Sequence, residues 1–220
     1  MPHLFLRKKQ TMTKLAESSS SDLGQVLIPI ARAAIFDAFG RPYDETAEDL
    51  PWLQEKGASF VTLTQNQKLR GCIGTLEAHR PLLIDVKANA QAAAFRDPRF
   101  SPLTAAELDY TEIEISLLSA MQAMAFSGER DALAQLQPGI DGIVFEFGRY
   151  RSTFLPQVWE QLPDADVFMA HLKHKAGLRP EFWDDEVKLY RYTVSKWKEK
   201  DITKDVEVLK SKPHGKRTTI

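Results

Sequence analysis

The segment LRGCIGT, Leu69 to Thr75, contains the single cysteine of the chain and neighbours that suit reactive chemistry. Gly71 and Gly74 let the backbone bend or be approached closely on either side of Cys72. Arg70 places a positive charge two residues from the thiol, and nucleophilic cysteines need such surroundings. A free cysteine more often packs as a small buried hydrophobe. The segment is therefore compatible with either a catalytic or a structural role for Cys72.

A nucleophilic cysteine also needs a base, and no histidine lies beside Cys72 in the sequence. His79 follows an expected turn, while His171 and His174 lie on a distant expected helix. Only the fold can bring one of them to the thiol. Because two histidines without an adjacent glutamate are a weak metal signal, we predict no metal. We also predict no cofactor, since GCIG lacks the spacing of a dinucleotide fingerprint and the lysine and hydroxyl of a P-loop.

Other charged residues could bind a substrate or simply stabilise the fold. The sequence FRDPRF brings Arg96, Asp97 and Arg99 together, and such a cluster can clamp a carboxylate or phosphate. Alternatively, Asp97 initiates a turn and pairs internally with one arginine. Glu112 and Glu114 share one side of an expected strand, where they form either a carboxylate pair or a solvated face.

The segment TFLPQVW joins the end of an expected strand to polar groups at Thr153 and Gln157. Its aromatic and proline residues suit the wall of a pocket or a surface for a partner protein. Equally, Phe154, Leu155 and Trp159 could belong to the core. The sequence does not decide between these roles.

The elements expected around these residues are mostly hairpins and helices. Asp22 is a plausible cap for the first helix, Pro81 suits the first turn of the second, and Thr104 with Glu107 has capping-box spacing. The expected helices span 22–40, 81–95 and 164–176, and the expected strands lie within 59–76, 111–118, 140–159 and 187–194. Because hairpins outnumber strand–helix–strand crossovers, we predict an α+β fold with a mainly antiparallel sheet and packed helices.

The composition is that of an ordinary globular protein, with 43% hydrophobic and 27% charged residues. We expect polar tails at 1–21 and 198–220 around one folded domain at 22–197. A single cysteine excludes an internal disulfide, and no apolar run approaches the roughly 20 residues that span a bilayer. These features, and a start that does not resemble a secretory signal, predict a cytoplasmic protein.

Several segments together resemble the AMMECR-type domain family, whose prokaryotic members include protein A of the AmmeMemoRadiSam system. They are FVTL at 60–63, LRGCIGT at 69–75, DPRF at 97–100, EISLLS at 114–119, GIVFEFGRYRSTFLPQVW at 142–159 and KAGL at 175–178. They occur in the family's order and cover roughly Leu23 to Trp197. The resemblance implies an α+β domain with a smaller lobe, and it carries no particular reaction with it.

The same resemblance implies linkage to a Memo-type protein, similar to non-haem iron dioxygenases, and to a radical-SAM protein. It also implies a candidate site. The residues carried over are Arg70, Gly71, Cys72, Gly74, Asp97, Arg99, Glu114, Thr153 and Gln157. Some family members have a cysteine just before KAGL, whereas this chain reads LKHKAGL, so a thiol pair with Cys72 is not predicted.

Three functions remain open, and whether the protein is an enzyme is among the open questions. The first is a component of a modification system, in which Cys72 acts on a small molecule or nucleotide and Arg70 or Arg99 holds an anion. The second is a scaffold for partner proteins with a structural Cys72. The third is RNA binding through the basic C-terminal tail, with Tyr190 and Tyr192 as stacking platforms. The balance of 29 basic against 30 acidic residues argues against RNA binding as the main role.

Overall fold

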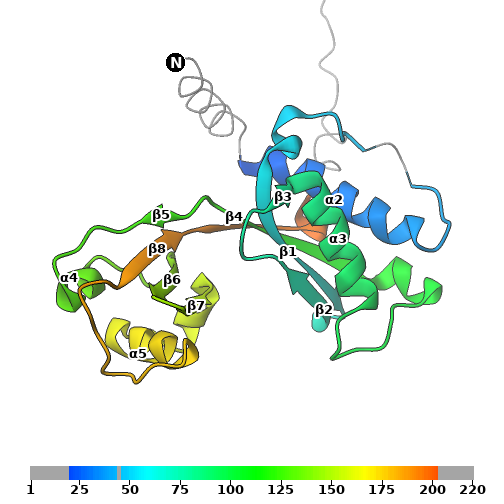
Figure 1. Ribbon diagram of the computed structural model, residues 1–220. Coiled ribbons are helices and arrows are strands. Elements are labelled where there is room, and N and C mark those ends of the chain that lie inside the picture. Colours follow the sequence, from blue (N-terminus) through cyan, green and yellow to red (C-terminus); the bar gives the residue numbers. More distant parts are fainter. Residues whose placement is uncertain (1–19, 44–45, 203–220) are drawn as a thin grey trace, which may run out of the picture. The chain divides into compact units, whose positions relative to one another are not determined.

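The computed structural model describes residues 20–43 and 46–202, so the predicted tails lie almost wholly outside the described residues (Figure 1). The chain forms two compact units. The first contains the described residues up to Leu117 and again from Lys196, and the second contains Leu118–Ser195. The second unit is therefore inserted, in sequence, into the first. Within the described residues, no helix has the length and apolar character needed to cross a membrane.

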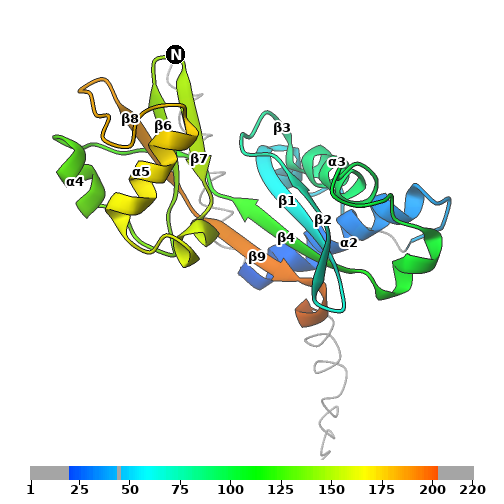
Figure 2. The same cartoon turned by 90° about the horizontal axis from the view of Figure 1, so that it is seen from below.

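The first unit is built on a five-stranded sheet (Figure 2). Its strands are β1 (Lys56–Gln65), β2 (Lys68–Gly74), β3 (Arg80–Pro81), β4 (Glu112–Leu118) and β9 (Val194–Lys198). The order is β2-β1-β4-β9, and β3 pairs with β1. Strand β2, which carries Cys72, is consequently an edge strand.

The hairpin β1–β2 confirms the hairpin predicted at 59–76. Asn66 and Gln67 form its turn with φ angles of 49° and 63°, as a two-residue turn of the primed type requires. The register then shifts, because Thr64 pairs with Leu69 while Leu63 pairs with Gly71. Arg70 is the extra residue of this β-bulge. Bulges re-aim side chains, and this one decides what lies opposite Cys72.

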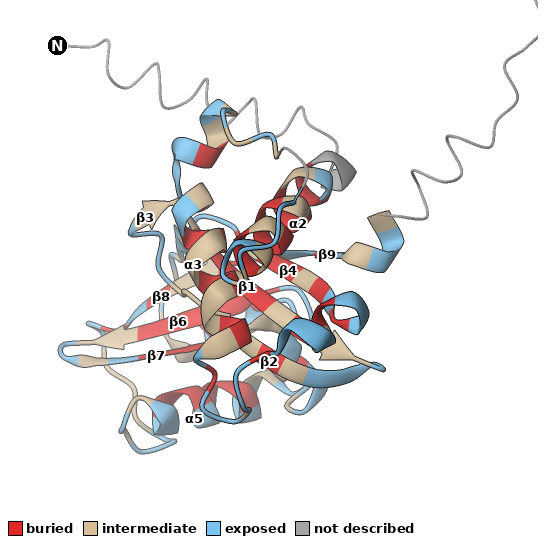
Figure 3. Ribbon diagram, turned by 90° about the vertical axis from the view of Figure 1, so that its right-hand side faces the viewer, coloured by how far each residue is buried: buried red, intermediate tan, exposed pale blue. Residues whose placement is uncertain are grey.

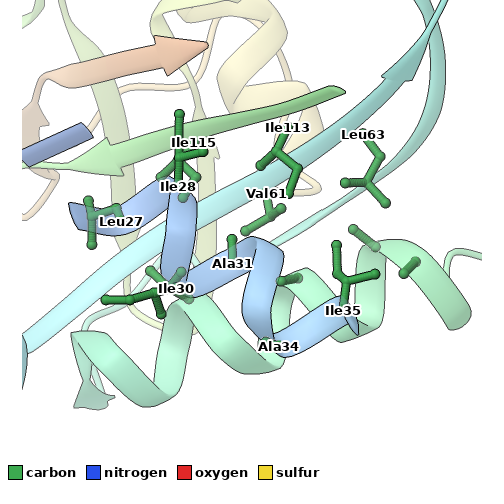
Figure 4. Packing of buried hydrophobic residues seen from close by; sticks show 14 of the residues in the cluster. Leu27, Ile28, Ile30, Ala31, Ala34, Ile35, Val61, Leu63, Ile113 and Ile115 are labelled. Carbon is green, nitrogen blue, oxygen red and sulfur yellow. The ribbon is translucent and has the colours of Figure 1, made fainter. Parts of the chain in front are cut away.

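Two helices pack on one side of this sheet. Helix α3 (Leu82–Phe95) lies on β1 and β2, and α2 (Ser20–Asp37) lies on α3. The core residues that they share with β1 and β4 are Leu27, Ile28, Ile30, Ala31, Ala34, Ile35, Val61, Leu63, Ile113 and Ile115 (Figure 4). Figure 3 shows buried stretches in red along α2, β1 and β4. Short 3-10 helices η1 (Pro51–Gln54) and η2 (Ala105–Tyr110) complete the unit.

The ends of these helices differ from the prediction by a few residues. Helix α2 begins at Ser20 rather than after Asp22, and it ends at Asp37, with Gly40 in the following turn at φ 63°. Pro81 precedes α3 as its extended cap instead of lying in the first turn. The predicted capping box is confirmed: the Glu107 carboxylate accepts bonds of 2.8 Å from the Thr104 N–H and hydroxyl.

The predicted boundary at Trp197 falls inside β9, and helical residues continue from Glu199 to Ile202. Buried Arg32 holds this segment. It bonds the Glu199 carboxylate and donates to the carbonyl oxygens of Leu108 at 3.2 Å and Thr111 at 2.7 Å. The first unit therefore includes the chain that follows the second unit.

The second unit has a four-stranded sheet of order β5-β8-β6-β7 with α5 packed beside β7. Its elements are β5 (Gln122–Ala123), α4 (Glu129–Ala134), β6 (Gly142–Phe147), β7 (Tyr150–Phe154), η3 (Pro156–Glu160), α5 (Ala165–Lys175) and β8 (Lys188–Tyr192). The predicted hairpin at 140–159 and the helix at 164–176 are confirmed. Trp159 stacks on Phe168 with ring centroids 3.7 Å apart, which places the end of TFLPQVW in the core.

Burial does not alternate strictly from residue to residue in two strands. In β4, Ile113 and Ile115 are buried, but Ser116 is also buried and Leu117 is only half-buried, at the point where the chain leaves the first unit. In β8, Tyr192 is buried, although one hypothesis from the sequence made it a stacking platform for RNA. Both sheets are built from antiparallel pairs wherever the pairing is described, so the predicted α+β class with a mainly antiparallel arrangement is confirmed.

Candidate functional site

The main chain of Cys72 is held by two of the predicted residues. Its N–H donates to Asp97 Oδ2 at 2.8 Å, and its carbonyl oxygen accepts a bond from Arg99 Nη2 at 3.2 Å. Arg99 also grips Asp97, with Nε 2.9 Å from Oδ1 and Nη2 2.7 Å from Oδ2. The pair satisfies the outward N–H and C=O of an edge strand, which an added strand would otherwise bond.

The Asp97–Arg99 pair is an internal ion pair. Asp97 is 4% exposed, and the Arg99 guanidinium, helped by the N–H of Cys72, holds the pKa of its carboxyl well below the usual range. Asp97 in turn raises the pKa of Arg99. The structure therefore agrees with the second alternative for FRDPRF, a turn in which Asp97 pairs internally with one arginine, here Arg99.

Cys72 is a half-buried residue, and its Sγ atom accepts a hydrogen bond from the Thr62 hydroxyl at 3.3 Å. Thr62 lies directly opposite Cys72 in β1. Because the Cys72 N–H is bonded to Asp97, the two residues form a non-hydrogen-bonded pair, in which side chains come closest. Sequence reasoning missed Thr62.

The two glycines of LRGCIGT are explained by packing. A Cβ atom on Gly71 would lie 2.2 Å from the carbonyl oxygen of Ala93 in α3, and one on Gly74 would lie 2.2 Å from the ring of Phe60. Gly71 thus lets helix and strand approach closely. These contacts fill the space beside each glycine where a Cβ atom would lie, so that space is not available to a substrate.

Arg70 forms its ion pair with Glu107 and not with the Cys72 thiol. Its Nε and Nη2 atoms donate to the two carboxylate oxygens of Glu107 at 2.9 and 3.3 Å. Arg70, with Thr104 and Gln65, holds the pKa of Glu107 at about 2 against the usual 4.5. The bulge that re-aims Arg70 therefore ties β2 to η2.

Glu114 is not brought to Cys72. It forms an ion pair with Lys198 at 3.7 Å, and Glu112 forms one with Lys200 at 3.9 Å. Since β4 lies two strands from β2 and neighbouring strands are about 4.8 Å apart, roughly 10 Å separates their backbones. The two glutamates act as members of separate ion pairs.

Thr153 and Gln157 belong to the second unit. The Thr153 hydroxyl lies 3.0 Å from the Tyr192 hydroxyl, and its carbonyl oxygen accepts a bond from Lys175 at 2.9 Å. Gln157 is an exposed residue of η3. Tyr192 is 2% exposed, its ring lies against Gly142, and burial raises the pKa of its hydroxyl. A stacking role for Tyr192 on RNA was therefore a wrong prediction, because the ring has no open face.

The described histidines form no recorded bond to the thiol. His79 Nδ1 lies 3.0 Å from the Glu77 carbonyl oxygen, and His171 and His174 are exposed residues of α5 in the second unit. Across residues 20–43 and 46–202, no three His, Cys, Asp or Glu side chains gather as metal ligands.

Comparison with known proteins places the chain in a family. The model of the AMMECR1 family matches residues 28–197. The chain belongs to the AMMECR1 family. An AMMECR1-family relative in Methanothermobacter thermautotrophicus is 37% identical over 178 residues, which are 79% of this chain and 92% of that protein. Protein MJ0810 of Methanocaldococcus jannaschii is 39% identical over 142 residues, 63% of this chain and 71% of its own length.

A solved structure supports the AMMECR1 fold. The crystal structure of the uncharacterized protein PH0010 from Pyrococcus horikoshii superposes with a TM-score of 0.66 at 32% identity, covering 81% of this chain and 92% of that one. The α+β fold of two antiparallel sheets with packed helices is thus shared with that protein.

In this AMMECR1-family protein, a buried polar cluster lies near the candidate site and was missed by sequence reasoning. Asp85 in α3 is fully buried and accepts bonds from the Ser59 hydroxyl at 2.7 Å, Thr75 at 2.7 Å, Arg80 at 2.8 Å and Asn89 at 3.0 Å. The signal in the sequence was a pair of polar residues four apart, Asp85 and Asn89, inside an alanine-rich helix.

Proposed function

We propose that this AMMECR1-family protein is a component of a modification system, working with Memo-type and radical-SAM proteins, in which Cys72 is a nucleophile toward a small molecule or nucleotide. One observation carries the proposal. Asp97 and Arg99 fix the main chain of Cys72 at both its N–H and its C=O, while Cys72 as a residue is only half-buried. A reacting group held in place in this way has little ordering left to do when a substrate arrives.

The proposed step is a displacement at an electrophilic carbon. The Cys72 Sγ atom forms a bond to that carbon, the leaving group departs with the bonding electron pair, and the thiol proton passes to a base. Thr62, the hydrogen-bond partner of Sγ, is not a base. We assign the base to a partner protein or to the substrate, so the complete site forms only in the assembled system.

The choice of partners rests on the family. The AMMECR-type resemblance implies linkage to Memo-type and radical-SAM proteins in prokaryotes. Among the described residues, no histidine is bonded to the thiol, and this fits a role as one component among several. The partners are then expected to cover Cys72 and to bring the substrate to it.

A scaffold function is the second candidate, and the pairing of the arginines favours it. Arg70 is bonded to Glu107 and Arg99 to Asp97, so the two cations proposed to hold an anion already have carboxylate partners. In this case Cys72 is structural, and the protein organises partner enzymes through its surface.

Reconstitution of the full chain with the Memo-type and radical-SAM proteins separates the two candidates. With Cys72 as nucleophile, intact-mass spectrometry detects a covalent adduct on the wild-type chain and none on a Cys72→Ser variant that still binds the partners. If Cys72→Ser supports the same product formation, the scaffold function is correct. If neither partner binds the folded chain, membership in such a system is wrong.

A further inference from the structure

One face of helix α3 lies along strand β2, which carries Cys72. Asp85, Asn89 and Ala93 are spaced four residues apart, so they lie above one another on the helix. The Ala93 carbonyl oxygen fills the space that a Cβ atom on Gly71 would need. Asp97, four residues further along and just beyond the helix, bonds the Cys72 N–H. This line of residues therefore meets β2 at more than one point.

The other end of the line holds Thr75, three residues beyond Cys72. The Thr75 hydroxyl donates to Asp85 Oδ1 at 2.7 Å, and Asn89 Nδ2 lies 3.1 Å from the same hydroxyl oxygen. The Thr75 N–H donates to the Ser59 carbonyl oxygen at 2.9 Å, and Asp85 Oδ2 accepts a 2.8 Å bond from the Ser59 N–H. Thr75 is thus bonded to α3 through its side chain and to β1 through its main chain.

Burial of the Asp85 carboxylate makes the loss of any of its hydrogen bonds costly. The carboxylate is fully buried, so each donor that it loses leaves a desolvated oxygen without a replacement from water. Arg80 covers the outer side of the cluster, with its side chain 30% exposed and Nε 2.8 Å from Oδ1. The described polar groups of this cluster are hydrogen-bonded to one another, so the cluster does not need a ligand to complete it. We assign it the role of holding neighbouring elements together.

We propose that Asp85 and Thr75 are positioning residues for Cys72. Asp97 fixes β2 at Cys72, and Asp85 fixes the chain at Thr75, the residue directly after β2, so the short segment between them cannot shift along α3 without breaking a charge-assisted bond. The functional meaning of this two-point attachment rests on the proposed role of the Cys72 thiol. The attachment itself is a property of the fold and is tested separately.

The test compares Thr75→Val, which keeps the shape but loses the hydroxyl, with Thr75→Ser, which keeps the hydroxyl. Amide hydrogen exchange is measured by NMR at Cys72 and Thr75, together with the alkylation rate of the thiol. Loss of the bond to Asp85 raises local opening, so we expect exchange about fivefold to tenfold faster in Thr75→Val and near wild type in Thr75→Ser. Ile30→Val in the same core is the control for a general loss of stability, and it should leave the ratio of the two amides to distant core amides unchanged.

Unchanged exchange at Cys72 in a folded Thr75→Val protein would overturn the inference. If Thr75→Val does not fold, Arg80→Gln removes a partly exposed member of the cluster instead. About twofold to threefold faster exchange at Thr75 and Cys72 then supports the inference, and no change overturns it. A thiol that never reacts in the native wild type, combined with faster exchange in Thr75→Val, refutes the nucleophile proposal and leaves the attachment of β2 standing.

Discussion

Replacement of Glu107 by glutamine tests how strongly η2 is tied to the Cys72 hairpin. Arg70 bonds both carboxylate oxygens of Glu107 and holds the pKa of this group at about 2, against 4.5 ordinarily. This difference corresponds to roughly 3 kcal/mol of stability above pH 4.5. Because the side chain is partly open to solvent, screening reduces the contribution, and we expect Glu107→Gln to cost about 1–2 kcal/mol at pH 7.

The pH dependence of this cost has a definite sign. A carboxylate whose pKa is lowered by folding contributes its full stability above the unfolded value and loses it as the pH falls through the folded value. The gap between wild type and Glu107→Gln should therefore shrink below pH 4.5, to roughly two fifths of its pH 7 size at pH 3. Urea denaturation at both pH values measures the gap.

Glu112→Gln is the matched control, because Glu112 is paired with Lys200 at 3.9 Å and lies half-exposed. Its cost should stay under about 0.5 kcal/mol at either pH. A gap for Glu107→Gln that is the same at pH 3 and pH 7, or absent at pH 7, would refute the assignment of the stabilisation to the ionised Arg70–Glu107 pair.

Three further substitutions test individual contacts by urea denaturation. Gly71→Ala should cost about 1–3 kcal/mol, because the new methyl group meets the Ala93 carbonyl oxygen, and a fully stable variant would contradict that packing. Tyr192→Phe should cost about 1 kcal/mol by removing the hydroxyl bonded to Thr153, whereas Tyr190→Phe should cost little; equal effects would argue against the buried hydroxyl bond. Asp97→Asn should cost about 1–3 kcal/mol and speed exchange of the Cys72 amide, and an unaltered amide would show that this residue does not hold the strand.

The elements of this fold follow from local patterns. Alternating apolar residues and a polar turn predicted both hairpins, and Thr104 with Glu107 predicted the start of η2, because these signals lie within a few residues of each other. The burial of Tyr192 in β8 could not be predicted from such local patterns. Tyr192 points inward because Gly142 on the neighbouring strand leaves room for its ring, and that pairing joins residues 50 apart in sequence.

The partners of Cys72 depended on a single extra residue. A regular hairpin around Asn66 and Gln67 would place Val61 opposite Cys72, and the bulge at Arg70 replaces it with Thr62. A local pattern does not reveal such a bulge, because it is stabilised by the ion pair between Arg70 and a distant Glu107. For DPRF the sequence left an anion clamp and a turn with an internal ion pair as alternatives, and its bond to the Cys72 main chain depends on where the end of α3 meets β2.

The most direct test of the proposed function is the alkylation of Cys72 by iodoacetamide in the native protein and in denaturant. The chain has one cysteine, so the modified mass reports this thiol alone. The proposal predicts a native reaction at a rate comparable to that of the unfolded chain, and a similar rate when Glu112→Gln is introduced as a distant control. A thiol that reacts only after unfolding would contradict a nucleophilic Cys72 in the isolated chain and would favour the scaffold function.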